Sequence, residues 1–183
     1  ILSWADSINI FNTGVSSTNT LLAAGAVDPH YSITTNLVSG TFAYVASNSV
    51  YPLPSPWQPQ GPNSQWIAPT TDTNGPIGNY TYTTTFDLTG LNAATAILLG
   101  GWNTDNNGVN IFLNGNPLGS TTTFTQFACC FVPFSVSSGF LPGINTLQFV
   151  VNNGGGPTGL RVEITSATAD PLNQVPEPAT LLL

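Results

Sequence analysis

Few residues in this chain are of the types that do chemistry. The 183 residues include eight acidic side chains, but only one arginine, one histidine and no lysine. A P-loop and a lysine Schiff base both need a lysine, and the chain holds too few histidines for a zinc site built on two or three of them. One arginine cannot form the basic patch that a nucleic-acid binder needs. The composition therefore excludes nucleotide hydrolysis, imine chemistry, such zinc sites and nucleic-acid binding.

A catalytic triad can be drawn but is poorly supported. His30 lies two residues after Asp28, and many serines are available as nucleophiles. No Gly-x-Ser-x-Gly elbow occurs, and the carboxylates are too scattered to suggest a glycosidase pair. A lone histidine in a proline-containing turn is more typical of a hydrogen-bonded structural residue. We therefore predict no catalytic residue and no enzyme activity.

A carbohydrate site is one interpretation of the tryptophans and the amides beside them. Sugars stack on exposed tryptophan faces, while amide and carboxylate groups bind their hydroxyls. Burial in the core is the other interpretation of a tryptophan, and we expect it for Trp66. The predicted sugar-binding residues are Trp57, Trp102, Asn103, Asp105 and Asn107.

The segment from Asn103 to Gly108 is also rich in oxygen ligands of the kind that calcium prefers. Its spacing does not match an EF-hand loop, and Asn, Asp and Gly are ordinary turn residues. We predict no metal and no cofactor, with calcium at Asp105 as the weaker alternative.

The two cysteines, Cys129 and Cys130, are adjacent. In a regular strand one would face the core and the other would face solvent or a neighbouring molecule. A disulfide between them in a kinked strand, two free thiols and an intermolecular bridge all remain open.

The candidate binding residues and the two cysteines must be positioned by β-strands. No long stretch has a period of 3.6, whereas short alternating runs recur between Gly, Pro and Asn. We expect Ala96 to Leu99 to be a strand buried on both faces, Asn114-Gly115 to form a hairpin turn, and the five prolines from Pro52 to Pro62 to lie in a long surface loop. The other expected strands are 41–47, 79–88, 109–113, 145–151 and 160–164. This pattern predicts one all-β sandwich or barrel.

The order of several motifs resembles the galactose-binding-like family. The segments are Tyr82 to Leu88, Ile111 to Gly119 and Leu141 to Leu147, preceded by shorter pieces such as Asn12 to Val15. The resemblance implies a jelly-roll β-sandwich with antiparallel sheets over residues 1–168, followed by a tail at 169–183. This family includes sugar-binding domains, although a fold does not fix a function.

The end of the chain resembles the PEP-CTERM sorting signal of Gram-negative bacteria. The matching residues are Val175, Pro176, Glu177, Pro178, Ala179 and Thr180, followed by three leucines. The apolar run is too short to span a bilayer, and the helix and basic cluster of the full signal are absent. The resemblance implies signal-peptide export, handling by an exosortase, and a place outside the cell or on its surface.

Composition favours self-assembly as the function. Exposed sheet edges are usually guarded by charge, lysine above all, and the neutral Thr, Asn and Ser surface gives copies little mutual repulsion. We therefore predict an exported structural protein, a subunit of an extracellular filament or biofilm matrix lattice that binds copies of itself. The alternative is a carbohydrate-binding module whose partner is a polysaccharide.

Overall fold

The computed structural model describes residues 5–35 and 42–172, and almost every regular element in them is a β-strand. The two helical turns, η1 (Ala93–Thr95) and η2 (Gln126–Ala128), are single 3-10 turns. The strands are β1 (Asp6–Ser7), β2 (Val27–Thr34), β3 (Phe42–Val45), β4 (Ile67–Ala68), β5 (Gly78–Asp87), β6 (Ile97–Asp105), β7 (Asn107–Leu113), β8 (Asn116–Pro117), β9 (Val132–Val136), β10 (Ile144–Asn153) and β11 (Gly159–Ala169).

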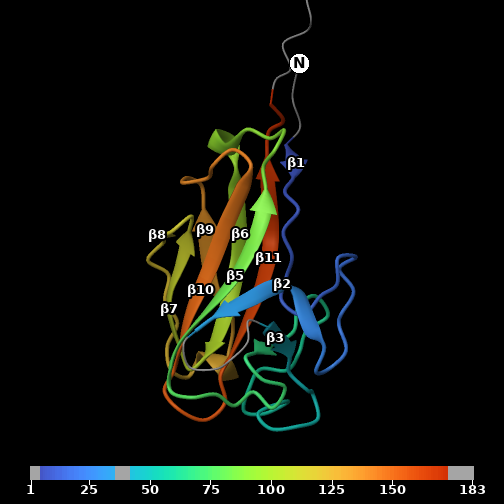
Figure 1. Ribbon diagram of the computed structural model, residues 1–183, viewed down its shortest axis with the longest axis vertical. Helices are drawn as coiled ribbons and strands as arrows, with labels where there is room; N and C mark the ends of the chain where they lie inside the picture. Colours follow the sequence, from blue (N-terminus) through green and yellow to red (C-terminus); the bar gives the residue numbers. More distant parts are fainter. Residues whose placement is uncertain (1–4, 36–41, 173–183) are drawn as a thin grey trace, which may run out of the picture.

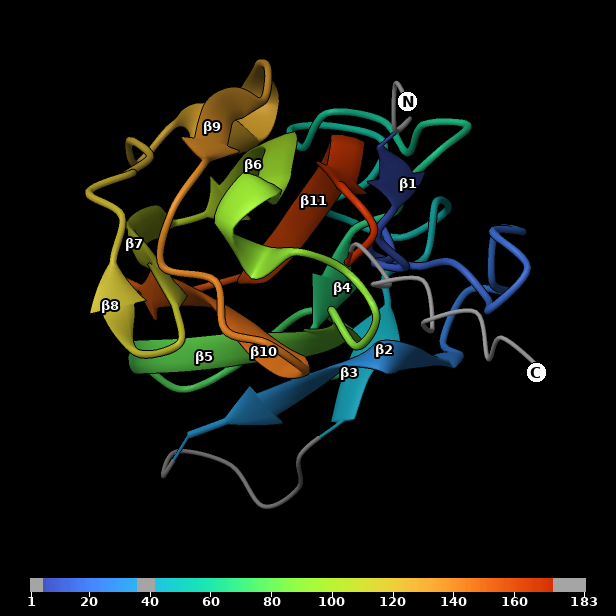
Figure 2. The same cartoon turned by 90° about the horizontal axis from the view of Figure 1, so that it is seen from above.

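The strands form one antiparallel sheet that curls into two layers. Its order is β8-β7-β10-β5-β2-β3-β4-β11-β6-β9, with β1 paired to β11. Figure 1 shows the long strands running side by side, and Figure 2 shows β5, β10 and β2 in one layer and β6, β9 and β11 in the other. The short pairing of β3 with β4 joins the layers. The predicted fold class, an all-β jelly-roll sandwich with antiparallel strands, is confirmed.

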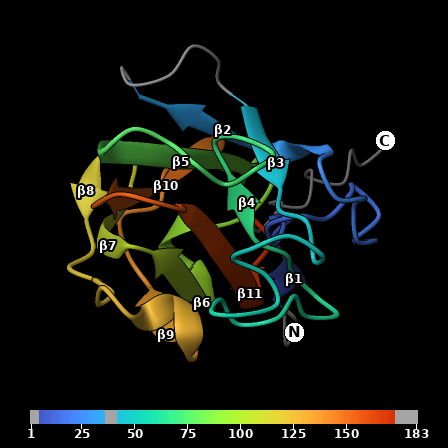
Figure 3. The ribbon, with the colours of Figure 1, turned by 90° about the horizontal axis from the view of Figure 1, so that it is seen from below.

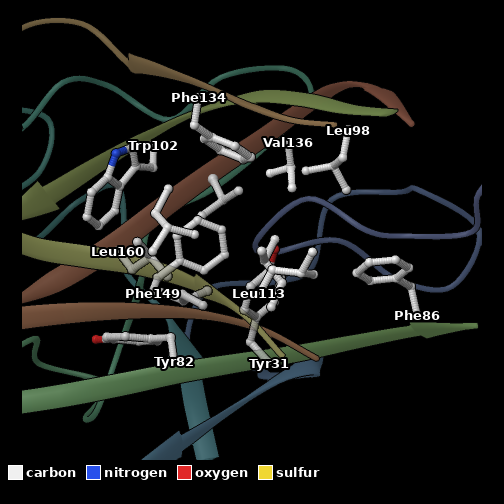
Figure 4. Close-up of a cluster of buried hydrophobic side chains, with 14 of the residues drawn as sticks. Tyr31, Tyr82, Phe86, Leu98, Trp102, Leu113, Phe134, Val136, Phe149 and Leu160 are labelled. Atoms are coloured by element: carbon white, nitrogen blue, oxygen red, sulfur yellow. The ribbon is translucent and has the colours of Figure 1, made fainter. Parts of the chain in front are cut away.

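The core lies between the layers and is built by side-chain alternation. On β5, Tyr80, Tyr82 and Phe86 are buried while the residues between them face outward. Phe149 of β10 meets the opposite layer, with ring centroids 5.8 Å from both Trp102 and Phe134 (Figure 4). Burying large aromatic side chains in this way is the main stabilising contribution to such a sandwich.

The strand expected at 96–99 differs from the observed β6 (Ile97–Asp105) in burial and in length. Ala96 to Leu99 is not buried on both faces, because Ile97 and Leu99 are 43% and 38% exposed and only the alternate residues face the core. The segment from Asn103 to Gly108 is not a loop: β6 continues to Asp105, and β7 begins at Asn107. An antiparallel pairing of β6 with β11 along its whole length holds this polar stretch in the sheet.

The two ends of the curled sheet are short strands that each contain a proline. Pro117 lies in β8 and Pro133 in β9. Proline cannot donate a ladder hydrogen bond and is a common guard of sheet edges. The sheet ends therefore carry proline as a guard, although the chain offers them little charge.

The folded region extends a little beyond the predicted boundary at residue 168. Strand β11 ends at Ala169, and the backbone N–H of Leu172 donates to the carbonyl of Gly90 at 2.9 Å. The sorting-signal residues at 175–180 lie outside the described residues.

Candidate functional site

The proline-rich segment folds back over the outward face of β6 and β11 (Figure 3). The guanidinium of Arg161, on β11, donates through Nη1 to the carbonyl of Pro59 at 2.7 Å. The backbone N–H of Gln58 donates to the carbonyl of Phe127 at 2.6 Å. The predicted surface loop is therefore fixed both to the sheet and to the segment before β9.

This folding buries Trp57, which is 1% exposed. Its ring packs against Trp66 with centroids 4.5 Å apart, and its indole N–H donates to Asp105 Oδ2 at 2.6 Å. Beneath it, a Cβ on Gly159 would lie 2.7 Å from the Trp57 ring, so the glycine makes room for the close contact. Trp57 thus anchors the loop and offers no face to a sugar.

Trp102 is also unavailable, because it lies fully buried in the main core and donates its indole N–H to Ser120 Oγ at 3.0 Å. The prediction that Trp57 and Trp102 bind sugar is therefore wrong. Tryptophan burial, the other interpretation, holds for both, and the expected burial of Trp66 is confirmed.

The polar residues predicted beside the tryptophans are brought together but sealed from solvent. Asn103 is fully buried under the loop, and its Oδ1 has no hydrogen-bond partner. Asp105 is 5% exposed and accepts from Trp57 and from Asn106 Nδ2 at 2.7 Å. Asn107 is half-buried at the start of β7. A site closed in this way cannot admit a sugar.

The calcium alternative at Asp105 stays a prediction. Within residues 5–35 and 42–172, no three acidic, histidine or cysteine side chains gather where they could hold a metal ion. Both carboxylate oxygens of Asp105 already accept from N–H donors.

Burial raises the pKa of Asp105 to about 6, although the hydrogen bond from Trp57 opposes the shift. A carboxyl whose pKa is higher in the folded state binds more protons there than in the unfolded chain. The stabilisation from that proton is complete below the unfolded pKa of about 4 and is lost as the pH rises through about 6.

We therefore expect the contribution of Asp105 to the free energy of unfolding to fall as the pH rises from about 4 to about 6. Asp105→Asn removes this titration, so the variant should show a flatter pH dependence than the wild type. Urea unfolding at several pH values across that window measures the difference. Burial also raises the pKa of Asp28, but Asp28 titrates in both proteins and cancels in the comparison. Parallel curves for the two proteins would contradict the expectation.

Arg161 lies two residues before Glu163 on the same outward face of β11 and is 3% exposed. Besides Pro59 it donates through Nε to Ser64 Oγ at 2.9 Å, and its guanidinium lies 5.0 Å from the centre of the Phe131 ring. Burial lowers the pKa of Arg161, while the nearby charge of Glu163 opposes the shift. The only arginine therefore holds the segment with Pro59 and Ser64 against β11 and is not a surface charge.

Cys129 and Cys130 form a disulfide with each other. They lie between η2 and β9 rather than inside a strand, and both are exposed, so the alternation of a regular strand does not apply to them. Gln126 Nε2 donates to the carbonyl of Cys130 at 2.5 Å. Phe127 packs against the buried Trp57 and Trp66 cluster, which ties this loop to the proline-rich one.

An open groove crosses the outward face of β11 at Glu163 and Thr165, and we call it the Glu163 groove. On one side of these two residues is a polar hollow of about 390 Å³, and on the other is an apolar hollow of about 280 Å³. The polar hollow is completed by Asn12, Asn19, Pro62, Asn63 and Ile164. The apolar hollow is completed by Gly100, Gly101, Phe131 and Pro133.

Hydrogen bonds fix the polar side of the Glu163 groove. Glu163 Oε1 accepts from Asn63 Nδ2 at 2.9 Å, and Oε2 accepts from Ser64 Oγ at 3.1 Å. Asn12 donates through Nδ2 to the carbonyl of Asn63 at 2.9 Å and accepts from the backbone N–H of Ile164 at 2.7 Å. The carboxylate is therefore held in place before any ligand arrives.

Two backbone features shape the groove. The β6–β11 ladder shifts register between Ile164 and Ser166, which leaves Thr165 as a bulge residue beside Glu163. A Cβ on Gly101 would lie 2.7 Å from Phe131 Cβ, so only glycine lets Phe131 lie against β6. No local pattern in the sequence could reveal this groove, because its lining residues come from five separate segments.

His30 does not form a triad with Asp28. The carboxylate of Asp28 accepts from the backbone N–H groups of Gly14 and His30, at 2.6 and 2.8 Å. The imidazole instead stacks on Phe11 with ring centroids 3.7 Å apart, and its Nε2 has no partner.

No protein-family model matches the chain, and no curated protein sequence matches it. Among solved structures it is similar to a CBM35 from Paenibacillus barcinonensis, with a TM-score of 0.40 and 15% identity over 75% of this chain and 94% of that chain. Such a low similarity assigns neither a ligand nor a site. In the described part of the chain, no helix has the length and apolar character needed to cross a membrane.

Proposed function

We propose that this chain is a non-enzymatic binding protein that holds a polysaccharide in the Glu163 groove. The observation that carries the proposal is the pairing of two unlike hollows around one fixed carboxylate. One hollow is lined by amides and the other by Phe131, Pro133 and glycine backbone.

This pairing suits a sugar because a sugar ring has two kinds of surface. Its C–H faces pack on aromatic and proline rings, and its hydroxyls bond to amides and carboxylates. Ligand sites typically combine an apolar lining with a few fixed polar groups that orient the ligand. The groove is open rather than enclosed, so a polymer could run across it without presenting an end.

The proposed location is outside the cell. It rests on the sequence resemblance to a PEP-CTERM signal at residues 175–180, which implies export from a Gram-negative cell and handling by an exosortase. A binding protein placed at the surface or in the matrix would meet polysaccharide there.

Self-assembly into a filament becomes the second candidate. The low charge of the surface favours it, since 5% of the residues are charged. The short, proline-containing strands β8 and β9 weigh against growth by strand addition at the sheet ends. The carbohydrate-binding proposal therefore ranks first.

Filling the groove should weaken binding. Thr165 is exposed between the two hollows, so we expect Thr165→Trp to weaken binding of polysaccharide by about tenfold or more, since blocking the site removes several contacts at once. Affinity gel electrophoresis against neutral, amino-sugar and uronic polysaccharides measures this. Thr85→Trp on β5, in the other layer, is the matched control and should bind as the wild type does. If the wild type binds none of the polysaccharides, the proposed function is wrong.

A further inference from the structure

The charges around the Glu163 groove restrict which polysaccharide it can take. The formal net charge of the chain is -7, and the sequence contains one arginine and no lysine. That arginine, Arg161, is buried and committed to Ser64 and Pro59. No lysine or arginine side chain anywhere in the chain is therefore free to pair with a uronate, sulfate or phosphate group on a sugar.

Glu163, by contrast, keeps capacity to accept more hydrogen bonds. Each of its oxygens accepts one hydrogen bond in the structure, from Asn63 or from Ser64. A carboxylate has about four acceptor positions, so about two remain. Glu163 is half-buried at the centre of the groove, where a donor arriving from either hollow can reach it.

An ammonium group matches these vacant positions, because it carries three donors, no acceptor and a positive charge. Charge-assisted hydrogen bonds are about twice as strong as neutral ones. The negative net charge also attracts a cationic polymer at longer range, over about 8 Å at physiological ionic strength.

We infer that the Glu163 groove selects a polysaccharide with free amino groups, a glucosamine-type polymer, with the amine on Glu163 and the adjoining ring faces on Phe131 and Pro133. This rests on the proposed function and names its ligand class. Polymers of uronic acid are disfavoured, because their carboxylates would meet the carboxylate of Glu163, and the nearby guanidinium of Arg161 is buried and already bonded to Ser64 and Pro59.

Three soluble oligosaccharides of equal length test the inference: a glucosamine oligomer, its N-acetylated form and an oligouronate. We expect calorimetry, at a pH that protonates the amine, to show the glucosamine oligomer binding about tenfold more tightly than the N-acetylated form, and no binding of the oligouronate. Raising the salt from about 50 mM to about 500 mM should reduce that preference.

Glu163→Gln keeps the size of the side chain and removes its charge. It should lower the preference for the glucosamine oligomer over the N-acetylated form to about twofold or less. Asp87→Asn, which changes the net charge equally but lies exposed at the end of β5, should keep the preference.

The outcomes separate the two proposals. If none of the three oligosaccharides nor any longer polysaccharide binds, the proposed function fails. If the N-acetylated form or the oligouronate binds as tightly as the glucosamine oligomer, the ligand class is wrong while polysaccharide binding stands. If Glu163→Gln keeps the full preference, the amine is recognised elsewhere and the inference is overturned.

Discussion

Trp57→Ala is expected to lower the free energy of unfolding by about 3–5 kcal/mol, the usual cost of truncating a buried tryptophan. Trp57 is the centre of the smaller hydrophobic cluster, which also contains Ala46, Leu53 and Trp66. Its loss would leave a cavity over Gly159 and would remove the indole donor of the buried Asp105. The proline-rich loop should then separate from the sheet more readily.

Urea denaturation followed by circular dichroism measures the change. Phe124→Ala is the matched control, because Phe124 is 56% exposed and its truncation should change the free energy by about 0.5 kcal/mol or less. A decrease below about 1 kcal/mol for Trp57→Ala would show that the loop is not held by this ring.

Arg161→Met is expected to lower the free energy of unfolding by about 2–4 kcal/mol. Hydrogen bonds from a buried charged donor contribute about 1.5–3 kcal/mol each, and part of the energy lost with them is usually recovered. Methionine keeps much of the aliphatic volume but leaves the carbonyl of Pro59 without this donor. It also removes the guanidinium that lies over Phe131, so the apolar hollow of the Glu163 groove should lose its order.

Arg161→Lys is the informative partner variant, since it keeps the charge but not the planar set of donors. We expect the lysine variant to be intermediate in stability by urea denaturation. If Arg161→Met is as stable as the wild type, the arginine does not clamp the loop.

Regular alternation made much of the fold predictable. The strand expected at 79–88 forms as β5, and its face with Tyr80, Tyr82, Thr84 and Phe86 is buried. The Asn114-Gly115 turn forms between β7 and β8, with positive φ values of 51° and 81°. Both features depend on neighbouring residues alone, through the pleat of a strand and the steric freedom of glycine.

The candidate site was not predictable, because it depends on contacts between distant segments. Nothing near Trp57 in the sequence shows that its loop folds onto Gly159, about a hundred residues later, and a tryptophan among prolines is equally typical of an exposed platform. Glu163 falls inside the expected strand 160–164, and its neighbours in the sequence do not mark it as part of a site. Its role in a groove depends on Asn63 and Phe131, which no periodicity connects to it.

The disulfide between Cys129 and Cys130 has a consequence for the unfolded chain. In the chain-entropy account, a cross-link stabilises a protein by closing a loop in the denatured ensemble, and the effect grows with the number of residues enclosed. This one encloses none, since its cysteines are neighbours. The denatured chain keeps nearly all of its freedom, so the folded state must be held by its packing and hydrogen bonds. With both sulfurs used inside one loop, the oxidised chain also has no thiol left to join one molecule to another.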